Sequence, residues 1–186
     1  MGDTGSLLIR AERSMLLAVD LQQRLVPAID DGEGVVRRTA WLVRAAQKIG
    51  VPVAATEQYP QGLGPTATLL ADLLPAGSIG TKVHFSCAEA DCLGTLPGAN
   101  RPQVVIAGVE AHVCVLQTAL GLVGQDRQVF VVEDATGSRR AADKALALER
   151  MRQHGVTIVS KEMVVFEWLA RAGTPLFRDV SREFLR

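Results

Sequence analysis

The sequence has few aromatic residues and no excess of charge of either sign. Five Phe, two Trp and one Tyr make up 4% of the chain. Nonspecific single-strand binders need aromatic platforms for base stacking, and this composition offers little to build them from. Twenty basic and twenty acidic side chains cancel to a formal charge of zero. Because phosphate backbones and anionic lipids are held by basic surfaces, the composition argues against nucleic acid and membrane as partners.

Cysteine is scarce, and no long apolar run is present. The chain has three cysteines, Cys87, Cys92 and Cys114. Three cysteines are too few for a disulfide framework, and an odd number cannot all be paired. We therefore interpret the three as free thiols in a reducing compartment. No apolar run approaches the roughly 18 residues that a membrane-spanning helix needs. We therefore expect a cytoplasmic location.

The 186 residues, 48% of them hydrophobic, suit one domain. We expect residues 1–186 to form a single domain with a core at about 13–172 and a charged tail at 173–186 that reaches a neighbouring subunit. Short apolar runs alternate with longer helical patterns along this core. Strands are predicted at 15–19, 51–55, 78–83, 103–107, 128–132 and 156–159. Helical segments are predicted at 34–49, 67–74, 87–93, 113–123, 139–153 and 163–170.

This alternation predicts an α/β fold with a six-stranded parallel, doubly wound (Rossmann-like) sheet and helices on both faces. Right-handed crossovers leave few topologies, and the commonest six-stranded order is 3-2-1-4-5-6. In that order strands 1 and 4 are neighbours at the switch point, where ligands bind beyond the carboxyl ends of the strands. The site is therefore expected just after strand 1 and just after strand 4.

Three chemically active residues follow strands of this sheet. Asp20 comes directly after strand 1, Lys82 lies at the end of strand 3, and Cys114 lies in the first turn of the helix after strand 4. A helix N-terminus and a nearby ammonium group both favour a thiolate. An aspartate can accept the thiol proton and later return it to a leaving group. Together the three predict a cysteine hydrolase in which Asp takes the role of a general base.

Each residue also has an ordinary structural interpretation. An Asp at a strand end is often a cap or turn residue, a Lys there is usually solvated, and a buried Cys is commonly a small core residue. Their coincidence at the positions that the topology singles out favours catalysis. Two further alternatives stay open: a catalytically weak metabolite-binding or scaffold protein that retains the three residues, and a thiol redox sensor built on Cys114.

Several sequence motifs support a family resemblance. They are Leu17–Gln22, Lys82 followed by Phe85-Ser86, Ala107–Glu110 with Cys114-Val115, Val131–Ala135, Ala147–Met151, and the loop Glu57-Gln58-Tyr59-Pro60-x-Gly62-Leu63-Gly64. On these motifs the chain resembles the isochorismatase-like cysteine hydrolase superfamily over about residues 13–172. The Glu57–Gly64 loop is typical of the branch that contains the isochorismatase domain-containing proteins.

The resemblance implies roles for individual residues. Asp20 is similar to the family's general base, Lys82 to its triad lysine and Cys114 to its nucleophile. It also implies a cis peptide bond between Val109 and Glu110, with the N–H groups of Glu110 and Cys114 forming an oxyanion hole. The implied activity is hydrolysis of a small amide, or of a related carbonyl or imine carbon, through a thioester-type intermediate.

The resemblance further implies a small-molecule substrate and a homo-oligomer. Gln22, Tyr59, Phe85 and His112 are the candidate substrate-binding residues. Nicotinamidases of the superfamily carry an Asp-x-His metal site after strand 2, where this chain has Thr56-Glu57-Gln58-Tyr59-Pro60. We therefore expect neither a catalytic metal nor a cofactor. His84, Cys87 and Cys92 are soft ligands close together in sequence, but they lack a fourth partner for zinc.

Overall fold

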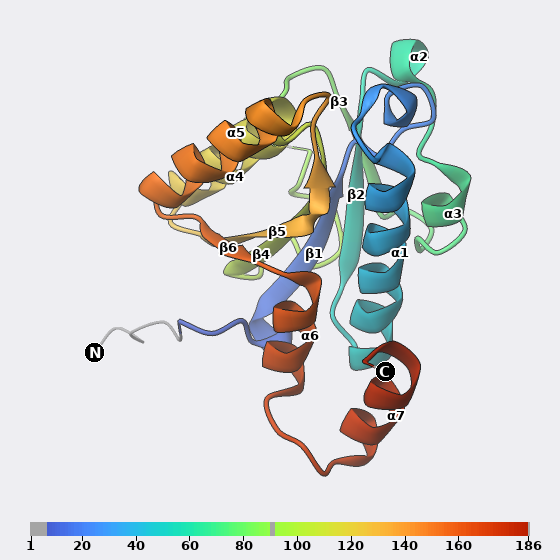
Figure 1. Cartoon of the computed structure of the whole chain (residues 1–186), viewed down its shortest axis with the longest axis vertical. Coiled ribbons are helices and arrows are strands. Elements are labelled where there is room, and N and C mark those ends of the chain that lie inside the picture. The colour runs from blue at the N-terminus through green and yellow to red at the C-terminus, as the bar shows by residue number, and fades with distance from the viewer. Residues whose placement is uncertain (1–6, 90–91, 186) are drawn as a thin grey trace.

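The computed structural model describes residues 7–89 and 92–185 and contains one parallel sheet with helices on both faces (Figure 1). The strand order is β3-β2-β1-β4-β5-β6, which confirms the predicted topology. The strands are β1 (Ser14–Val19), β2 (Val53–Gln58), β3 (Ile79–Lys82), β4 (Gln103–Val109), β5 (Gln128–Gly137) and β6 (Thr157–Val159). The carboxyl ends of β1 and β4 therefore lie side by side, with β2 and β3 beyond β1.

Two layers of helices cover the sheet (Figure 1). One layer contains α1 (Gly32–Ile49), α6 (Lys161–Leu169) and α7 (Pro175–Phe184), and the other contains α4 (Leu116–Val123) and α5 (Ala141–Gln153). Short helical segments lie in the connections: η1 (Ala11–Arg13), η2 (Val26–Ala28), α2 (Pro60–Leu63), α3 (Thr68–Ala71) and the π-helical turn η3 (Ala111–Val115). Among these described helices, none is both long enough and apolar enough to cross a bilayer.

The core consists of two clusters, one on each side of the sheet. Along β1, Leu16 joins the cluster beneath α1, whereas Met15, Leu17 and Val19 join the cluster beneath α4 and α5. Successive side chains of a strand point to opposite faces, so a strand covered on both faces is apolar throughout. This arrangement explains the unbroken apolar run and makes β1 a rigid support for the residue that follows it.

Several boundaries differ from the sequence-based expectation, and the largest shift is at the end of β5. β5 was expected to end at residue 132 but continues to Gly137, because its ladder with β4 resumes after a register shift and pairs Gly108 with Thr136 and Val109 with Gly137. α5 accordingly begins at Ala141 rather than at 139. The predicted helical segment 87–93 is a turn at residues 87–89, and residues 90–91 lie outside the described part of the chain.

The tail contains α7, and its expected contact with a neighbouring subunit stays a prediction. This helix packs on α1 of the same chain (Figure 1). The Phe184 ring meets Trp41 edge to face at a centroid distance of 5.6 Å, and Glu183 accepts a hydrogen bond from Arg44 at 3.0 Å. The tail folds back because its apolar side completes the core cluster beneath α1.

Candidate active site

Asp20 lies directly after β1, where its backbone adopts a left-handed conformation with φ of 52°. Its side chain is fully buried. Oδ2 accepts a hydrogen bond from Lys82 Nζ at 2.7 Å, and Oδ1 accepts one from the Thr56 hydroxyl at 2.6 Å. A buried carboxylate must be paired and hydrogen-bonded, and both oxygens meet that requirement. Asp20 is therefore held in a single orientation as one half of a buried ion pair.

Lys82 reaches Asp20 across the end of β2, which lies between their two strands. Adjacent strands are about 4.8 Å apart, so only a long side chain spans this gap. The ammonium group also donates to Gln58 Oε1 at 2.7 Å, and its side chain is fully buried. Gln58 is itself oriented by a hydrogen bond from its Nε2 to the Val83 carbonyl at 2.8 Å. The ends of β1, β2 and β3 thus form one buried polar cluster.

Cys114 lies in η3, directly after β4, and is 5% exposed. Burial makes the largest contribution to a rise in the pKa of its thiol from 9.0 to about 12; the charge of Asp20 and a hydrogen bond to that carboxylate also raise it, whereas Lys82 lowers it. The expected effect of Lys82 is present, because it lowers the pKa of the thiol, but burial acts in the opposite direction and is larger. Because Asp20 already neutralises the charge of Lys82, burial has the larger effect on the pKa of the thiol. The thiol of the resting site therefore has a pKa well above neutral pH.

The backbone between β4 and Cys114 has an unusual form. Gly108 has φ of 126°, and a Cβ at this position would lie 2.1 Å from the Val19 carbonyl oxygen, so only glycine allows β4 to approach β1 so closely. The peptide bond between Val109 and Glu110 is cis, at the position where the family resemblance implies one. The Glu110 carboxylate is anchored by two hydrogen bonds from the Arg139 guanidinium, at 2.8 and 3.2 Å.

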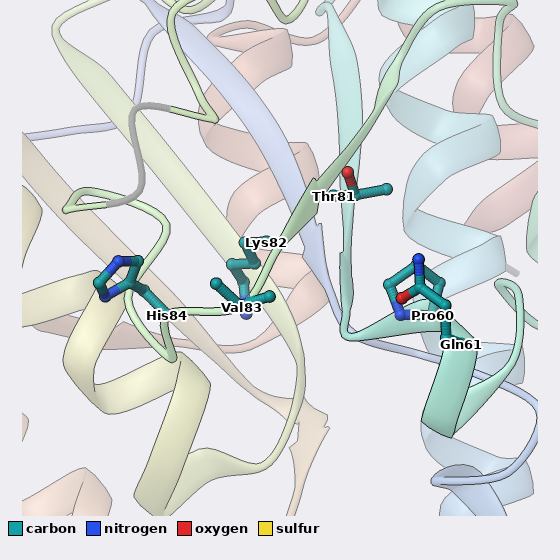
Figure 2. Close-up of a pocket in the computed structure, with 6 residues that line it drawn as sticks. All are labelled: Pro60, Gln61, Thr81, Lys82, Val83 and His84. Atoms are coloured by element: carbon teal, nitrogen blue, oxygen red, sulfur yellow. The ribbon is translucent and has the colours of Figure 1, made fainter.

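A cavity of about 350 Å³ adjoins the end of β3 (Figure 2). Its lining residues are Pro60, Gln61, Thr81, Lys82, Val83 and His84. Figure 2 shows Pro60 and Gln61 of α2 on one side of the end of β3 and His84 on the other. Neither Asp20 nor Cys114 lines this cavity, so it touches the buried cluster only through Lys82.

The four expected substrate-binding residues do not share one cavity. Tyr59 and Phe85 are 54% and 50% exposed. His112 lines a different cavity, of about 550 Å³, beside α4 and α5. Gln22 is fully buried, and its amide group donates to the Gln58 and Gly64 carbonyls and accepts from the Gln58 N–H. With both amide hydrogens used, Gln22 supports the loop that carries Gln58, and its expected contact with substrate stays a prediction.

Comparisons with known proteins show what this chain is similar to. The model of the family described as "Isochorismatase domain" matches residues 14–163. The chain belongs to the isochorismatase family. Membership of this family supports a hydrolase role, and the matched region contains Asp20, Lys82 and Cys114.

Several relatives of this isochorismatase domain are known. Isochorismatase domain-containing protein 1 of Danio rerio is 36% identical over 90% of this chain and 59% of its own length. The chain thus spans about three fifths of that relative. Isochorismatase domain-containing protein 2A of Mus musculus is 35% identical over 94% of this chain and 84% of its own length. The solved structure of MAR1 ribonuclease from Caenorhabditis elegans has a TM-score of 0.86 at 31% identity, covering 96% of this chain and 93% of that one.

Metal-ligating side chains are not clustered in the part of the domain that the structure describes. No group of three or more His, Cys, Asp or Glu side chains there is arranged to hold a metal ion, and this includes His84, Cys87 and Cys92. The Cys92 thiol instead donates a hydrogen bond to the Cys87 carbonyl at 3.7 Å.

Sequence reasoning missed three functional contacts of the isochorismatase domain. Thr56 and Gln58 bind the buried ion pair, and Arg139 binds Glu110. Two of these residues carried a usable signal. Thr56 and Gln58 end the strand predicted beside strand 1, and polar side chains at the carboxyl end of a buried strand point to a site.

Proposed function

We propose that this chain is a metal-independent cysteine hydrolase that acts on a small amide or a related carbonyl or imine carbon. The observation that carries the proposal is the position of Asp20, which faces both Lys82 and the Cys114 thiol inside a buried cluster. A carboxylate in this position can accept the thiol proton while Lys82 stabilises its charge.

The proposed reaction has two halves. In the first, Cys114 Sγ attacks the substrate carbon, the thiol proton moves to Asp20, and a sulfur–carbon bond forms. The C–N bond then breaks, and Asp20 returns the proton to the leaving amine. In the second, water attacks the thioester, Asp20 accepts a proton from it, and the carboxylic acid leaves as Cys114 regains its proton. The net change is amide plus water to acid plus amine.

Because the resting thiol has a pKa of about 12, the proton moves only as sulfur attacks. The backbone N–H groups of Glu110 and Cys114 serve as the proposed oxyanion donors, an arrangement that often supplies the largest part of catalysis. Arg139 holds the Glu110 side chain by two hydrogen bonds and so helps to fix the position of Glu110. Lys82 acts on the reaction through Asp20, whose orientation and charge it maintains.

One observation favours the alternative of a weak catalyst that mainly binds a metabolite. Cys114 is only 5% exposed and its thiol pKa is raised, so the free protein holds its nucleophile in an unreactive form. Under this alternative, a small molecule binds saturably at the cavity beside Lys82 but is not turned over. A comparison of binding with turnover for the same compounds separates the two functions.

The test is a panel of small amides assayed with the purified chain and with Cys114→Ser and Asp20→Asn variants. Cys92→Ser is the matched control, because it removes a thiol outside the proposed triad. We expect turnover that falls by about a thousandfold or more in the first two variants and persists in the control. Intact-mass spectrometry should show an acyl adduct on Cys114. Full turnover by Cys114→Ser would refute the mechanism, and saturable binding without turnover would favour the binding protein.

RNA belongs in the same panel, since the similar Caenorhabditis elegans protein is named a ribonuclease. The balanced charge and low aromatic content of this chain argue against binding of RNA. We therefore expect no RNA cleavage that depends on Cys114. Cleavage lost in Cys114→Ser but retained in Cys92→Ser would replace the amide with RNA as the substrate class.

Homo-oligomerisation stays a prediction. Val83 and Phe85 are 72% and 50% exposed directly after Lys82, and a second copy of the chain would bury them. Light scattering coupled to size exclusion measures the mass of the assembly. A mass of 19.9 kDa, that of one chain, would contradict the prediction.

A further inference from the structure

Two cysteines that the proposed hydrolysis does not use lie against each other in the segment after β3. The Cys92 thiol donates a hydrogen bond to the Cys87 carbonyl at 3.7 Å, and the two thiol groups are hydrogen-bonded to each other. Cys92 packs against the core cluster that contains Cys87. A disulfide bond requires two cysteines whose side chains point toward each other at short range. The contact between the two thiols meets that requirement.

Each of these cysteines is held by a different part of the fold. The Cys87 N–H donates a hydrogen bond to the Thr118 hydroxyl of α4 at 3.1 Å. Cys92 lies against β3, because a Cβ placed on Gly80 would be 3.2 Å from the Cys92 carbonyl oxygen and 3.6 Å from its Cβ. These contacts keep the two thiols beside each other, so a bond between them needs little movement of the backbone.

The two thiols differ in access and in acidity. Cys87 is fully buried, whereas Cys92 is half-buried. A hydrogen bond from Cys87 lowers the pKa of Cys92, and this effect together with the charge of Lys82 outweighs burial and the charge of Asp20. The same hydrogen bond, together with burial, raises the pKa of Cys87. Cysteines that react with peroxides are accessible thiols of low pKa, often with a second cysteine beside them.

We propose that Cys87 and Cys92 form a reversible disulfide when the protein meets a peroxide, with Cys92 as the thiol that reacts first and Cys87 as the thiol that resolves it. The pair is thus a site of oxidative modification. It is independent of the proposed hydrolysis, because neither cysteine belongs to the proposed triad.

The reaction has two steps and needs only the peroxide as oxidant. In the first, Cys92 Sγ attacks one oxygen of hydrogen peroxide, the O–O bond breaks, and a sulfenic acid and one water form. In the second, Cys87 Sγ attacks Cys92 Sγ, the S–O bond breaks, and the hydroxyl leaves with the Cys87 proton as a second water. The two thiols lose two electrons in total, and the peroxide gains them. A dithiol reductant reverses the change by thiol–disulfide exchange.

Cys114 should remain reduced under the same conditions. It is 5% exposed, and its thiol pKa of about 12 leaves little thiolate at neutral pH. Because the thiolate is the species that reacts, we expect Cys92 to be oxidised at least about tenfold faster than Cys114. This difference separates the Cys87–Cys92 pair from a redox sensor built on Cys114.

Peptide mapping of the whole chain tests the pair directly. The reduced protein is treated with equimolar hydrogen peroxide at pH 7, unfolded, alkylated with N-ethylmaleimide and digested with trypsin. Residues 83–101 contain both cysteines and no internal Lys or Arg, so one tryptic peptide holds the whole site. We expect this peptide to be lighter by two hydrogens and free of maleimide, and dithiothreitol before alkylation should restore two maleimides. A disulfide that includes Cys114, or two maleimides on peptide 83–101 after excess peroxide, would overturn the proposal.

Variants assign the two roles. Cys87→Ser removes the resolving thiol, so a sulfenic acid should accumulate on Cys92 and be trapped by dimedone. Cys87→Ala tests the same step without a hydroxyl group in the core and should give the same adduct. Cys92→Ser should slow oxidation of Cys87 at least about tenfold, because the remaining thiol is buried. Cys114→Ser is the matched control and should form the disulfide at the unaltered rate. Absence of a dimedone adduct in both Cys87 variants would refute the assignment of Cys92.

Discussion

The reactivity of the Cys114 thiol provides the sharpest test of the site. A pKa of about 12 in place of 9.0 reduces the thiolate fraction at pH 8 by about a thousandfold. Because the thiolate is the species that reacts, the alkylation rate of Cys114 by iodoacetamide should be lower by a similar factor than that of an ordinary thiol. The rate should rise about tenfold for each pH unit from 7 to 11 without reaching a plateau.

Replacing Asp20 with Asn should make Cys114 more reactive. Burial makes the largest contribution to the raised thiol pKa, but the Asp20 charge and its hydrogen bond to the thiol follow, and both disappear in the variant. Lys82 then remains as an unneutralised cation that favours the thiolate. Two unit charges about 4 Å apart near a protein surface interact by about 4 kcal/mol, so we expect alkylation at pH 8 to accelerate at least about tenfold.

The assay is performed in a Cys92→Ser background, with the labelled peptide identified by mass spectrometry. Cys87 is fully buried and the pKa of its thiol is raised, so it contributes little signal. A rate profile for Cys114 that reaches its plateau near pH 8.5 would refute the buried neutral thiol. Slower alkylation in Asp20→Asn would show that the carboxylate promotes the thiolate in the resting site, contrary to our reasoning.

Three other predictions follow from the same structure. Lys82→Met leaves the Asp20 carboxylate buried without its cation and should lower the free energy of unfolding by about 3–5 kcal/mol in urea denaturation. Adding Asp20→Asn should restore part of this loss, and strictly additive losses would contradict the ion pair. Phe184→Ala removes a buried ring from the interface with α1 and should cost about 3 kcal/mol; a loss within 0.5 kcal/mol, roughly that of a surface substitution, would show that α7 is not docked in solution. A hydrogen bond from Cys87 lowers the pKa of Cys92, so peptide mapping after brief alkylation at pH 7 should find Cys92 labelled first, and labelling of Cys114 before Cys92 would contradict this order.

The order of the strands was predictable because hydrophobic periodicity and crossover handedness are local properties. Buried parallel strands such as β1 read as continuous apolar runs, and right-handed connections leave few arrangements of six of them. The end of β5 was not predictable in this way. Residues 133–137 include polar side chains, and they remain in the sheet because β4 offers them a ladder after a register shift.

The packing of the tail could not be predicted from the sequence either. Its residues carry many charges, which suggested contact with a neighbouring subunit. Its apolar residues have a helical spacing that matters only where a complementary surface exists, and α1 provides that surface through Trp41 and Arg44. The sequence pattern allows a helix in this segment, and the neighbouring helix decides where it packs.

Within the candidate site, the positions of Asp20, Lys82 and Cys114 followed from the topology. The structure brings all three together. The supporting contacts of Thr56 and Gln58 depend on side-chain directions at the end of β2, which the sequence alone does not define. The raised pKa of the thiol was not predicted, because the sequence reasoning counted the helix N-terminus and the lysine but not burial.

The sequence by itself determined the sheet, the edge that carries the candidate site and the residue types available there. These depend on periodicity and on the order of elements along the chain. Tertiary structure alone decided that Lys82 neutralises Asp20, that Cys114 remains a buried neutral thiol and that the thiols of Cys87 and Cys92 are hydrogen-bonded to each other. The physical reason is that charge state and hydrogen-bond satisfaction depend on distance and burial, and in this fold both are set by segments far apart in the sequence.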